Sequence, residues 1–202
     1  MVKWIGIAVI TIGLSLIGYW YMEWSSATAS VDKMEKAEVE KLQSYTFTSI
    51  KPAKQSSPPP QTHKNGDQIA TLFIPLLQQK YTVYWGTDEQ TLTQGVGMYD
   101  SDVTTTPAQY GHTLLSGHRD TVFTQLKNVN VHDTLIVHYD GTYYEYTIQK
   151  QWITHKDDTT VIQKMTEPTL TLSTCYPFRY IGDAPERYIL QATLTGVVSE
   201  EN

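Results

Sequence analysis

The sequence predicts an all-β domain that follows a single membrane-spanning helix. From residue 69 onward, short runs rich in valine, isoleucine, threonine and aromatic residues alternate with clusters of turn residues, which is the pattern of a β-barrel or β-sandwich. Near the N-terminus, residues 4–22 form a run without a charge. With 202 residues, the chain is long enough for one domain with a core and an appendage, but short for two full domains.

The uncharged run contains 19 residues and lies between Lys3 and Glu23. At about 1.5 Å per helical residue, about 20 apolar residues cross a hydrocarbon core of about 30 Å. The run is longer than the core of a typical signal peptide, although Ala27-Thr28-Ala29 resembles a cleavage site. We therefore interpret residues 1–24 as a retained anchor, a short cytoplasmic end plus a single transmembrane helix. Aromatic residues suited to the membrane interface stand at both ends of the span, namely Trp4, Tyr19, Trp20, Tyr21 and Trp24.

Residues 25–66 are predicted to form a stalk or linker. The segment Val31–Gln43 mixes charged residues with fair helix formers, which indicates a short stalk helix. Pro58-Pro59-Pro60 cannot continue a helix and favours an extended spacer. The charge also changes here, because residues 1–66 carry a net charge of +2 and residues 67–202 a net charge of −8. An acidic domain repels nucleic acid, so we expect no nucleic-acid partner.

Residues 67–202 are predicted to be the folded domain. Asp140-Gly141 between two β-prone runs is a strong hairpin signal. Helical insertions are expected at Leu92–Tyr99 and Thr121–Leu126. The expected strands are Ile69–Ile74, Tyr81–Trp85, Thr113–Ser116, Thr134–Tyr139, Tyr143–Trp152, Thr169–Thr174 and Arg187–Leu194.

Cys175, the only cysteine, ends an alternating run that reads as a β-strand. A lone cysteine cannot form an intramolecular disulfide, so the thiol is either a buried, inert side chain or a functional one. A thiol attacks a carbonyl as its thiolate, which needs a nearby base or positive charge. The sequence offers His118 and Arg187 as these partners, and we take Cys175 as the candidate nucleophile. The three arginines, Arg119, Arg179 and Arg187, all lie beside the His118 and Cys175 stretches.

These motifs resemble those of the sortases, transpeptidases that attach proteins to the cell wall of Gram-positive bacteria. Thr171-Leu172-Ser173-Thr174-Cys175 is similar to the TLxTC motif of that family, and Gly117-His118 and Arg187 match its histidine and arginine. The resemblance runs from about residue 67 to the C-terminus. It is greatest to class D sortases, through the extended stretches Ser116–Thr121, Cys175–Phe178 and Ala184–Tyr188.

The resemblance implies a fold, a reaction and a location. The fold is the sortase-type eight-stranded β-barrel with short helices in its connections. The substrate is a protein with an LPxTG-like C-terminal sorting signal, cleaved after threonine to give a thioacyl-enzyme on Cys175. His118 then exchanges protons with the leaving and incoming amines, and Arg187 donates hydrogen bonds to the substrate or oxyanion. The acceptor is a cell-wall amine, no cofactor or metal is required, and the catalytic domain is extracellular on a single-pass anchor.

Two geometric expectations follow from a period of two residues along a strand. His112, Leu114, Ser116 and His118 share one face of their strand, as do Thr171, Ser173 and Cys175, and Arg187, Ile189 and Gln191. The ends of the three strands must converge if the site exists. The resemblance also implies that the segment Ile153–Pro168 is the substrate-selecting loop.

Several alternatives remain open at this point. His112 shares the parity of His118, and Arg179 is closer in sequence to Cys175 than Arg187 is. A papain-like peptidase would place its cysteine before its histidine, which is the reverse of the order here. One cysteine with scattered histidines shows no zinc spacing. A membrane-tethered, non-catalytic β-domain for adhesion or cell-wall binding is the strongest rival function.

Overall fold

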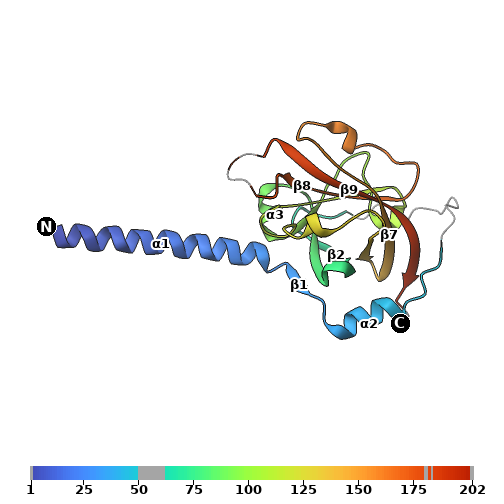
Figure 1. The fold of residues 1–202 in the computed structure, drawn as a ribbon, viewed down its shortest axis with the longest axis horizontal. Helices are drawn as coiled ribbons and strands as arrows, with labels where there is room; N and C mark the ends of the chain where they lie inside the picture. Colours follow the sequence, from blue (N-terminus) through green and yellow to red (C-terminus); the bar gives the residue numbers. More distant parts are fainter. Residues whose placement is uncertain (1, 50–61, 180–181, 183, 201–202) are drawn as a thin grey trace.

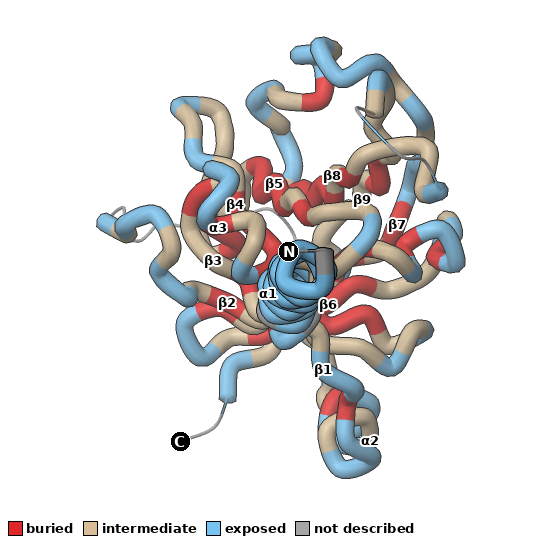
Figure 2. Tube along the Cα trace, turned by 90° about the vertical axis from the view of Figure 1, so that its left-hand side faces the viewer, coloured by how far each residue is buried: buried red, intermediate tan, exposed pale blue. Residues whose placement is uncertain are grey.

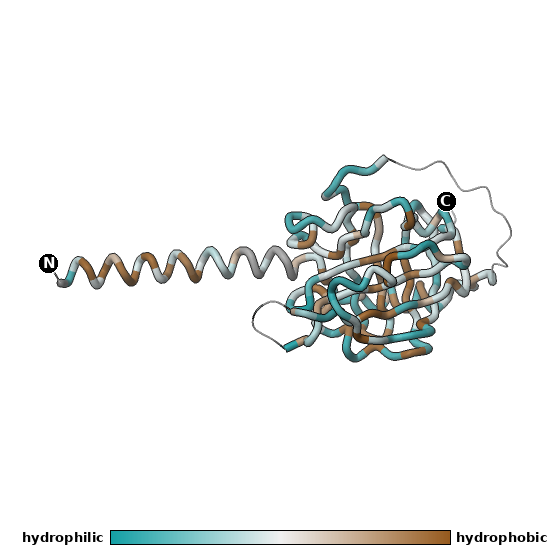
Figure 3. The backbone as a smooth tube through the Cα atoms, turned by 90° about the horizontal axis from the view of Figure 1, so that it is seen from above, coloured by the Kyte–Doolittle hydropathy of each residue, from teal (hydrophilic) through white to brown (hydrophobic). Residues whose placement is uncertain are grey.

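A computed structural model describes residues 2–49, 62–179, 182 and 184–200 of the chain. The predicted spacer Pro58-Pro59-Pro60 lies outside the described residues. Helix α1 (Val2–Thr28) projects from the β-structure of the other described residues (Figure 1). Its segment Lys3–Met22 has a mean hydropathy of 1.8, and none of it is buried, so α1 is long and apolar enough to cross a membrane. Figure 3 shows the hydrophobic residues distributed along this helix.

Eight strands close into a barrel, as the resemblance to the sortases implied. In spatial order they are β3, β2, β6, β7, β9, β8, β5 and β4, and a parallel pairing of β3 with β4 closes the ring. The other parallel pair is β5 with β8, and the remaining barrel pairings are antiparallel. The strand bounds are β2 Gln68–Ile74, β3 Gln79–Trp85, β4 Val96–Met98, β5 His112–Gly117, β6 Thr134–Tyr139, β7 Thr142–His155, β8 Thr169–Tyr176 and β9 Glu186–Ser199.

The hydrophobic core fills the interior of the barrel. Alternate residues of a strand point to opposite faces, and buried and less buried positions alternate from Tyr144 to Ile148 of β7. In β6, Leu135, Ile136 and Val137 are all buried, because Ile136 packs in a second cluster with Met34 and Leu42. Figure 2 colours the described residues by burial. The connection between β5 and β6 adds Phe123 and Leu126, which are both 0% exposed. Large inward-facing side chains with no more than 1% exposure include Leu72, Tyr81, Leu115, Leu135, Tyr146, Ile148, Leu170, Leu172 and Leu190.

The predicted hairpin joins β6 to β7. Asp140 and Gly141 have positive φ angles of 49° and 69°, as a two-residue turn of the hairpin type requires. The side-chain space at Gly141 is open. The sequence signal Asp-Gly therefore fixed the register of β6 and β7, in which Tyr139 pairs with Thr142.

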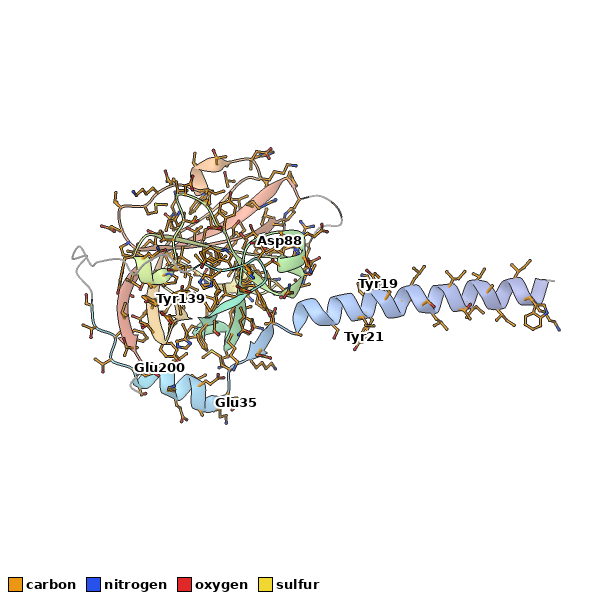
Figure 4. All side chains as sticks on the ribbon, turned by 180° about the vertical axis from the view of Figure 1, so that it is seen from behind. Tyr19, Tyr21, Glu35, Asp88, Tyr139 and Glu200 are labelled. Carbon is orange, nitrogen blue, oxygen red and sulfur yellow. The ribbon has the colours of Figure 1, made fainter. Side chains whose placement is uncertain are left out.

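The stalk segment folds against the barrel over residues 31–48. Strand β1 (Val31–Lys33) pairs with the first half of β3. The second half of β3 pairs with β4. Helix α2 (Lys36–Ser44), the predicted stalk helix, begins at a capping box of Glu35 and Glu38. It is held by ion pairs of Glu38 with Lys80 and of Lys41 with Glu200, and Figure 4 labels Glu35 and Glu200 beside it. Met34 and Leu42 pack on Phe73, Ile136 and Tyr143 of the barrel.

The junction between α1 and the barrel is short. Helix α1 ends at Thr28, and Ser30 is already buried, with its carbonyl accepting a hydrogen bond from the amide of Thr82 at 3.0 Å. A Cβ at Gly95, which follows helix α3 (Glu89–Gln94), would lie 2.8 Å from Cβ of Ser30. The C-terminal part of α1 therefore lies against α3.

The prediction of helical insertions was partly wrong. Within Leu92–Tyr99, α3 covers only the first three residues, and Val96–Met98 is strand β4. The reason is long-range pairing: Val96 is 0% exposed and pairs with Val83 of β3. Within Thr121–Leu126 the chain forms turns that lead into a 3-10 helix, η3 (Leu126–Asn128). The other short 3-10 helices are η1 (Pro75–Leu77), η2 (Pro107–Gln109) and η4 (Thr159–Val161).

Candidate active site

The register of three adjacent strands brings the candidate residues to one end of the barrel. Cys175 near the end of β8 lies directly opposite Arg187 at the start of β9. On its other side β8 is parallel to β5, with Thr174 opposite Gly117. His118 follows Gly117, and Cys175 follows Thr174. The two candidate residues are therefore neighbours at the same edge of the sheet.

A cavity of about 390 Å³ opens at this edge, and His118, Cys175 and Arg187 all line it. The alternation expected from the sequence is seen in part, because Leu114, Ser116 and His118 line the cavity from β5 and its end, but Gly117 and Thr174 line it as well. Ser173 and Cys175 line it from β8, and Arg187 and Ile189 from β9. The cavity floor is thus one continuous face of β5, β8 and β9.

Backbone packing fixes the place of His118. Gly117 has no room for a side chain, since a Cβ there would lie 2.6 Å from Cγ2 of Val122 and 2.8 Å from Cδ2 of Phe123. The carbonyl of His118 accepts a hydrogen bond from the amide of Phe123 at 2.9 Å. Glycine before the histidine is therefore required so that the following turn can pack closely on the end of β5.

Cys175 is held through its neighbour Thr174. The Thr174 hydroxyl, which is buried, donates a 2.7 Å hydrogen bond to the carbonyl of Gly117. This bond joins β8 to β5 one residue before both Cys175 and His118. Cys175 itself is partly exposed in the cavity wall and is not part of a disulfide. A ligand in the cavity can therefore reach the thiol.

Arg187 presents its guanidinium to the same cavity. Its Nη1 donates to the carbonyls of Ala184 at 3.2 Å and Glu186 at 3.0 Å. Among the described residues these two bonds use Nη1 alone, and Arg187 is part of the cavity lining. Arg179, the alternative arginine, is exposed and is not part of the cavity lining. Arg119 donates through Nη2 to the carbonyl of Gly182 at 3.0 Å.

The loop between β7 and β8 forms one wall of the cavity. Its polar contribution includes Lys156 and Asp158, and its apolar contribution is Val161 and Ile162. Asp158 caps η4 by accepting hydrogen bonds from the amide of Thr160 at 2.9 Å and from the hydroxyls of Thr154 and Thr160. These bonds lower the pKa of Asp158. The Asp158 carboxylate therefore stabilises the conformation of the loop.

Some lining residues were not foreseen from the sequence. Thr87 and Leu92 reach the cavity from the turn before α3 and from α3 itself. No local pattern marks them, because their place depends on the pairing of β3 with β4. The cap at Asp158 could have been found, since Asp-Thr-Thr is a typical start of a helical turn. His112 lies outside the cavity lining, which argues against it as an alternative to His118.

A closed eight-stranded barrel with a cavity of this kind at the end of β8 is the fold of the sortases, a class of transpeptidases. The chain belongs to the sortase family, because the model of the sortase domain matches residues 72–195. It is 36% identical over 197 residues to Sortase D of Bacillus subtilis (strain 168), covering 94% of this chain and 97% of that protein. The sequence-based resemblance to class D sortases is thereby confirmed.

Solved structures agree with this assignment. The catalytic domain of B. anthracis SrtD is 57% identical, with a TM-score of 0.62, and the match covers 73% of this chain and 100% of that one. A Clostridium perfringens Sortase D5 transpeptidase matches with a TM-score of 0.58 and 23% identity, over 80% of this chain and 89% of that one. The second likeness concerns the fold alone. Family membership makes this chain a transpeptidase.

Proposed function

We propose that the chain is a membrane-anchored cysteine transpeptidase that acts on LPxTG-like C-terminal sorting signals. Residues 67–202 are its catalytic domain, residues 25–66 its stalk and residues 1–24 its anchor. It cleaves after the threonine of the signal, carries the protein as a thioacyl-enzyme on Cys175 and transfers it to a cell-wall amine. The observation that carries the proposal is the pairing of Cys175 with Arg187 across β8 and β9, with His118 at the neighbouring strand end.

The chemistry assigns one role to each side chain. The Cys175 thiolate attacks the threonine carbonyl, and the carbonyl oxygen becomes an oxyanion that accepts hydrogen bonds from Arg187. When the C–N bond breaks, protonated His118 gives its proton to the leaving amine. Neutral His118 then takes a proton from the incoming amine, which attacks the thioester. The C–S bond breaks, and the thiolate and protonated histidine are restored.

The apolar segment Lys3–Met22 of α1 is long enough to cross a membrane, which supports an anchored protein. We place the N-terminus inside and the barrel on the extracellular side because of the proposed reaction. The substrates of a cell-wall transpeptidase are found on that side. The barrel also brings its cavity end close to α1, because α3 both contacts α1 and supplies Leu92 to the cavity lining (Figure 1).

Intact-protein mass spectrometry of the full chain in detergent tests the proposal. The protein is mixed with an LPxTG-like peptide and then with an amine. We expect a mass gain equal to the acyl part of the peptide, which the amine discharges and which is absent in Cys175→Ala. A folded protein that forms no adduct across a panel of sorting peptides would instead indicate the tethered, non-catalytic β-domain.

A further inference from the structure

His112 is a buried histidine to which the proposed chemistry gives no role. It lies at the start of β5, on the same face as Leu114, Ser116 and His118, but beyond the cavity floor. The residue is only 1% exposed. Both nitrogens of a buried imidazole need hydrogen-bond partners, since an unpaired one loses its contact with water without compensation.

Both nitrogens of His112 have such a partner. Nδ1 lies 2.7 Å from the carbonyl oxygen of Gln163, and Nε2 lies 2.8 Å from Oγ1 of Thr171. A carbonyl can only accept, so we assign the hydrogen to Nδ1. Burial lowers the pKa of His112, which keeps the ring neutral near pH 7. Nε2 therefore accepts from the Thr171 hydroxyl.

These two partners belong to two different segments that both contribute residues to the cavity lining, although neither partner lines the cavity itself. Thr171 is on β8, four residues before Cys175 on the same face of the strand. Gln163 is in the loop between β7 and β8, directly after Val161 and Ile162, which form the apolar part of the cavity wall. The imidazole thus connects the strand of the nucleophile to the wall of the cavity.

An apolar contact complements this connection. Val161 is 7% exposed and packs on Leu114 and Ile189 of the cavity floor. The apolar contact holds the loop where it passes over the floor, and the hydrogen bond holds its backbone two residues later. A loop fixed at both points keeps the cavity at one width.

We propose that His112 is a positioning residue that attaches the β7–β8 loop to β8 and thereby sets the affinity of the cavity for the acyl substrate, a sorting-signal peptide. The proposal rests on the proposed function. His112 touches no reacting atom. Its loss therefore lowers the fraction of protein molecules whose β7–β8 loop is in the binding-competent position. We therefore expect it to act on KM for the peptide and to leave kcat almost unchanged.

The test compares full-length variants in detergent by steady-state kinetics and amide hydrogen exchange. His112→Phe keeps a ring but removes both hydrogen bonds, so KM for an LPxTG-like peptide should rise about tenfold, while kcat changes less than about twofold. Amides of residues 159–166 should exchange faster. His112→Asn keeps a donor near the position of Nδ1. Its KM and its amide exchange rates should lie between those of the wild type and those of His112→Phe. Gln163→Ala leaves the accepting carbonyl in place and is the matched control, with wild-type values expected.

Two results would overturn the proposal. One is a folded His112→Phe protein with wild-type KM and loop exchange. The other is a fall in kcat at unchanged KM, which would give His112 a part in the chemistry itself. Hydrogen exchange needs no turnover, so it reports on the attachment of the loop even if the wild-type protein transfers no peptide, a result that would reject the proposed function instead.

A milder variant covers the case in which His112→Phe does not fold. Thr171→Val removes only the donor to Nε2 and keeps the size of the side chain. We expect a rise in KM of about two- to threefold and a smaller increase in exchange over the same loop. Unchanged KM and unchanged exchange in this variant would contradict the proposal.

Discussion

At the end of the barrel far from the cavity, β6 and β7 meet in the two-residue turn Asp140-Gly141, and adjacent residues determine the geometry. At the cavity end, the chain is held by contacts between distant segments. Gly117 packs on Val122 and Phe123, and the Thr174 hydroxyl is bonded to the carbonyl of Gly117. One end is therefore specified locally, and the other is specified by tertiary structure.

This difference separates stability from function. Changes at the far end should cost stability alone, because the long strands β7 and β9 lie between that end and the cavity. Changes at the cavity end should affect the positions of Cys175, His118 and Arg187 as well. The following predictions test this separation, in order of expected effect.

Cys175→Ala should have the largest effect on activity and almost none on the fold. We expect transpeptidation to fall by about 10³-fold or more, because the nucleophile is removed. The midpoint of thermal unfolding should remain near that of the wild type, since the thiol is partly exposed and is in no disulfide. Peptide transfer and circular dichroism measure the two quantities. Measurable transfer by the alanine variant would refute the assigned nucleophile.

Arg187→Lys should reduce the rate by about 10²–10³-fold, the usual cost of losing an oxyanion donor. Lysine keeps the positive charge but lacks the planar group with several fixed donors. The matched control is Arg179→Lys, for which we expect wild-type kinetics because Arg179 is exposed outside the cavity lining. If Arg179→Lys instead lowered kcat/KM more than Arg187→Lys, the role of oxyanion donor would belong to Arg179.

Alanine at two glycines compares the two ends directly. Gly117→Ala should lower the free energy of unfolding by about 1–3 kcal/mol through overpacking against Val122 and Phe123, and it should also reduce kcat by displacing His118. Gly141→Ala should cost about 1–2 kcal/mol, because its φ is positive, while kcat stays at the wild-type value. Urea unfolding and peptide kinetics on both variants decide the matter. Equal losses of kcat would show that the two ends are coupled.

Acidification should produce the smallest effect, a gradual loss of stability below the ordinary histidine pKa. Burial lowers the pKa values of His112 and His138 in the folded chain, so the unfolded chain binds protons first as pH falls from about 6.5. The contribution of these two histidines to the free energy of unfolding is fully present above that pH. It decreases as the pH falls toward their lowered pKa values. Urea unfolding between pH 7 and pH 5 measures the trend. His112→Asn, which does not titrate, should weaken it.

Much of the barrel could be predicted from the sequence, because its strands are long enough to show their pattern. The run Thr134–Tyr139 was predicted with its observed bounds, and the Asp-Gly turn beside it was confirmed. Strands β1 and β4 have three residues each and were missed. Three residues cannot display a period of two, and both strands exist because β3 offers them an edge.

The candidate site was predicted in a different way. Cys175, His118 and Arg187 were found through motifs, and the structure brings all three to one cavity, while their catalytic roles remain proposals. Leu92 and Asp158, which also line the cavity, lie in connections whose position depends on tertiary packing. The connection of His112 to Gln163 spans 51 residues and involves a backbone carbonyl, which no sequence pattern can reveal.

The short junction at Ser30 has a consequence for the proposed membrane-anchored enzyme. If α1 ends its apolar span at Met22, about eight residues at about 1.5 Å each separate the membrane surface from a residue already bonded within the sheet. In the membrane-anchored arrangement proposed above, the barrel would therefore stand about 12 Å above the lipid, at about 1.5 Å per residue. The same arrangement would confine its working range to the thin layer next to the membrane, and the proposed sorting signal would be accessible only at that height.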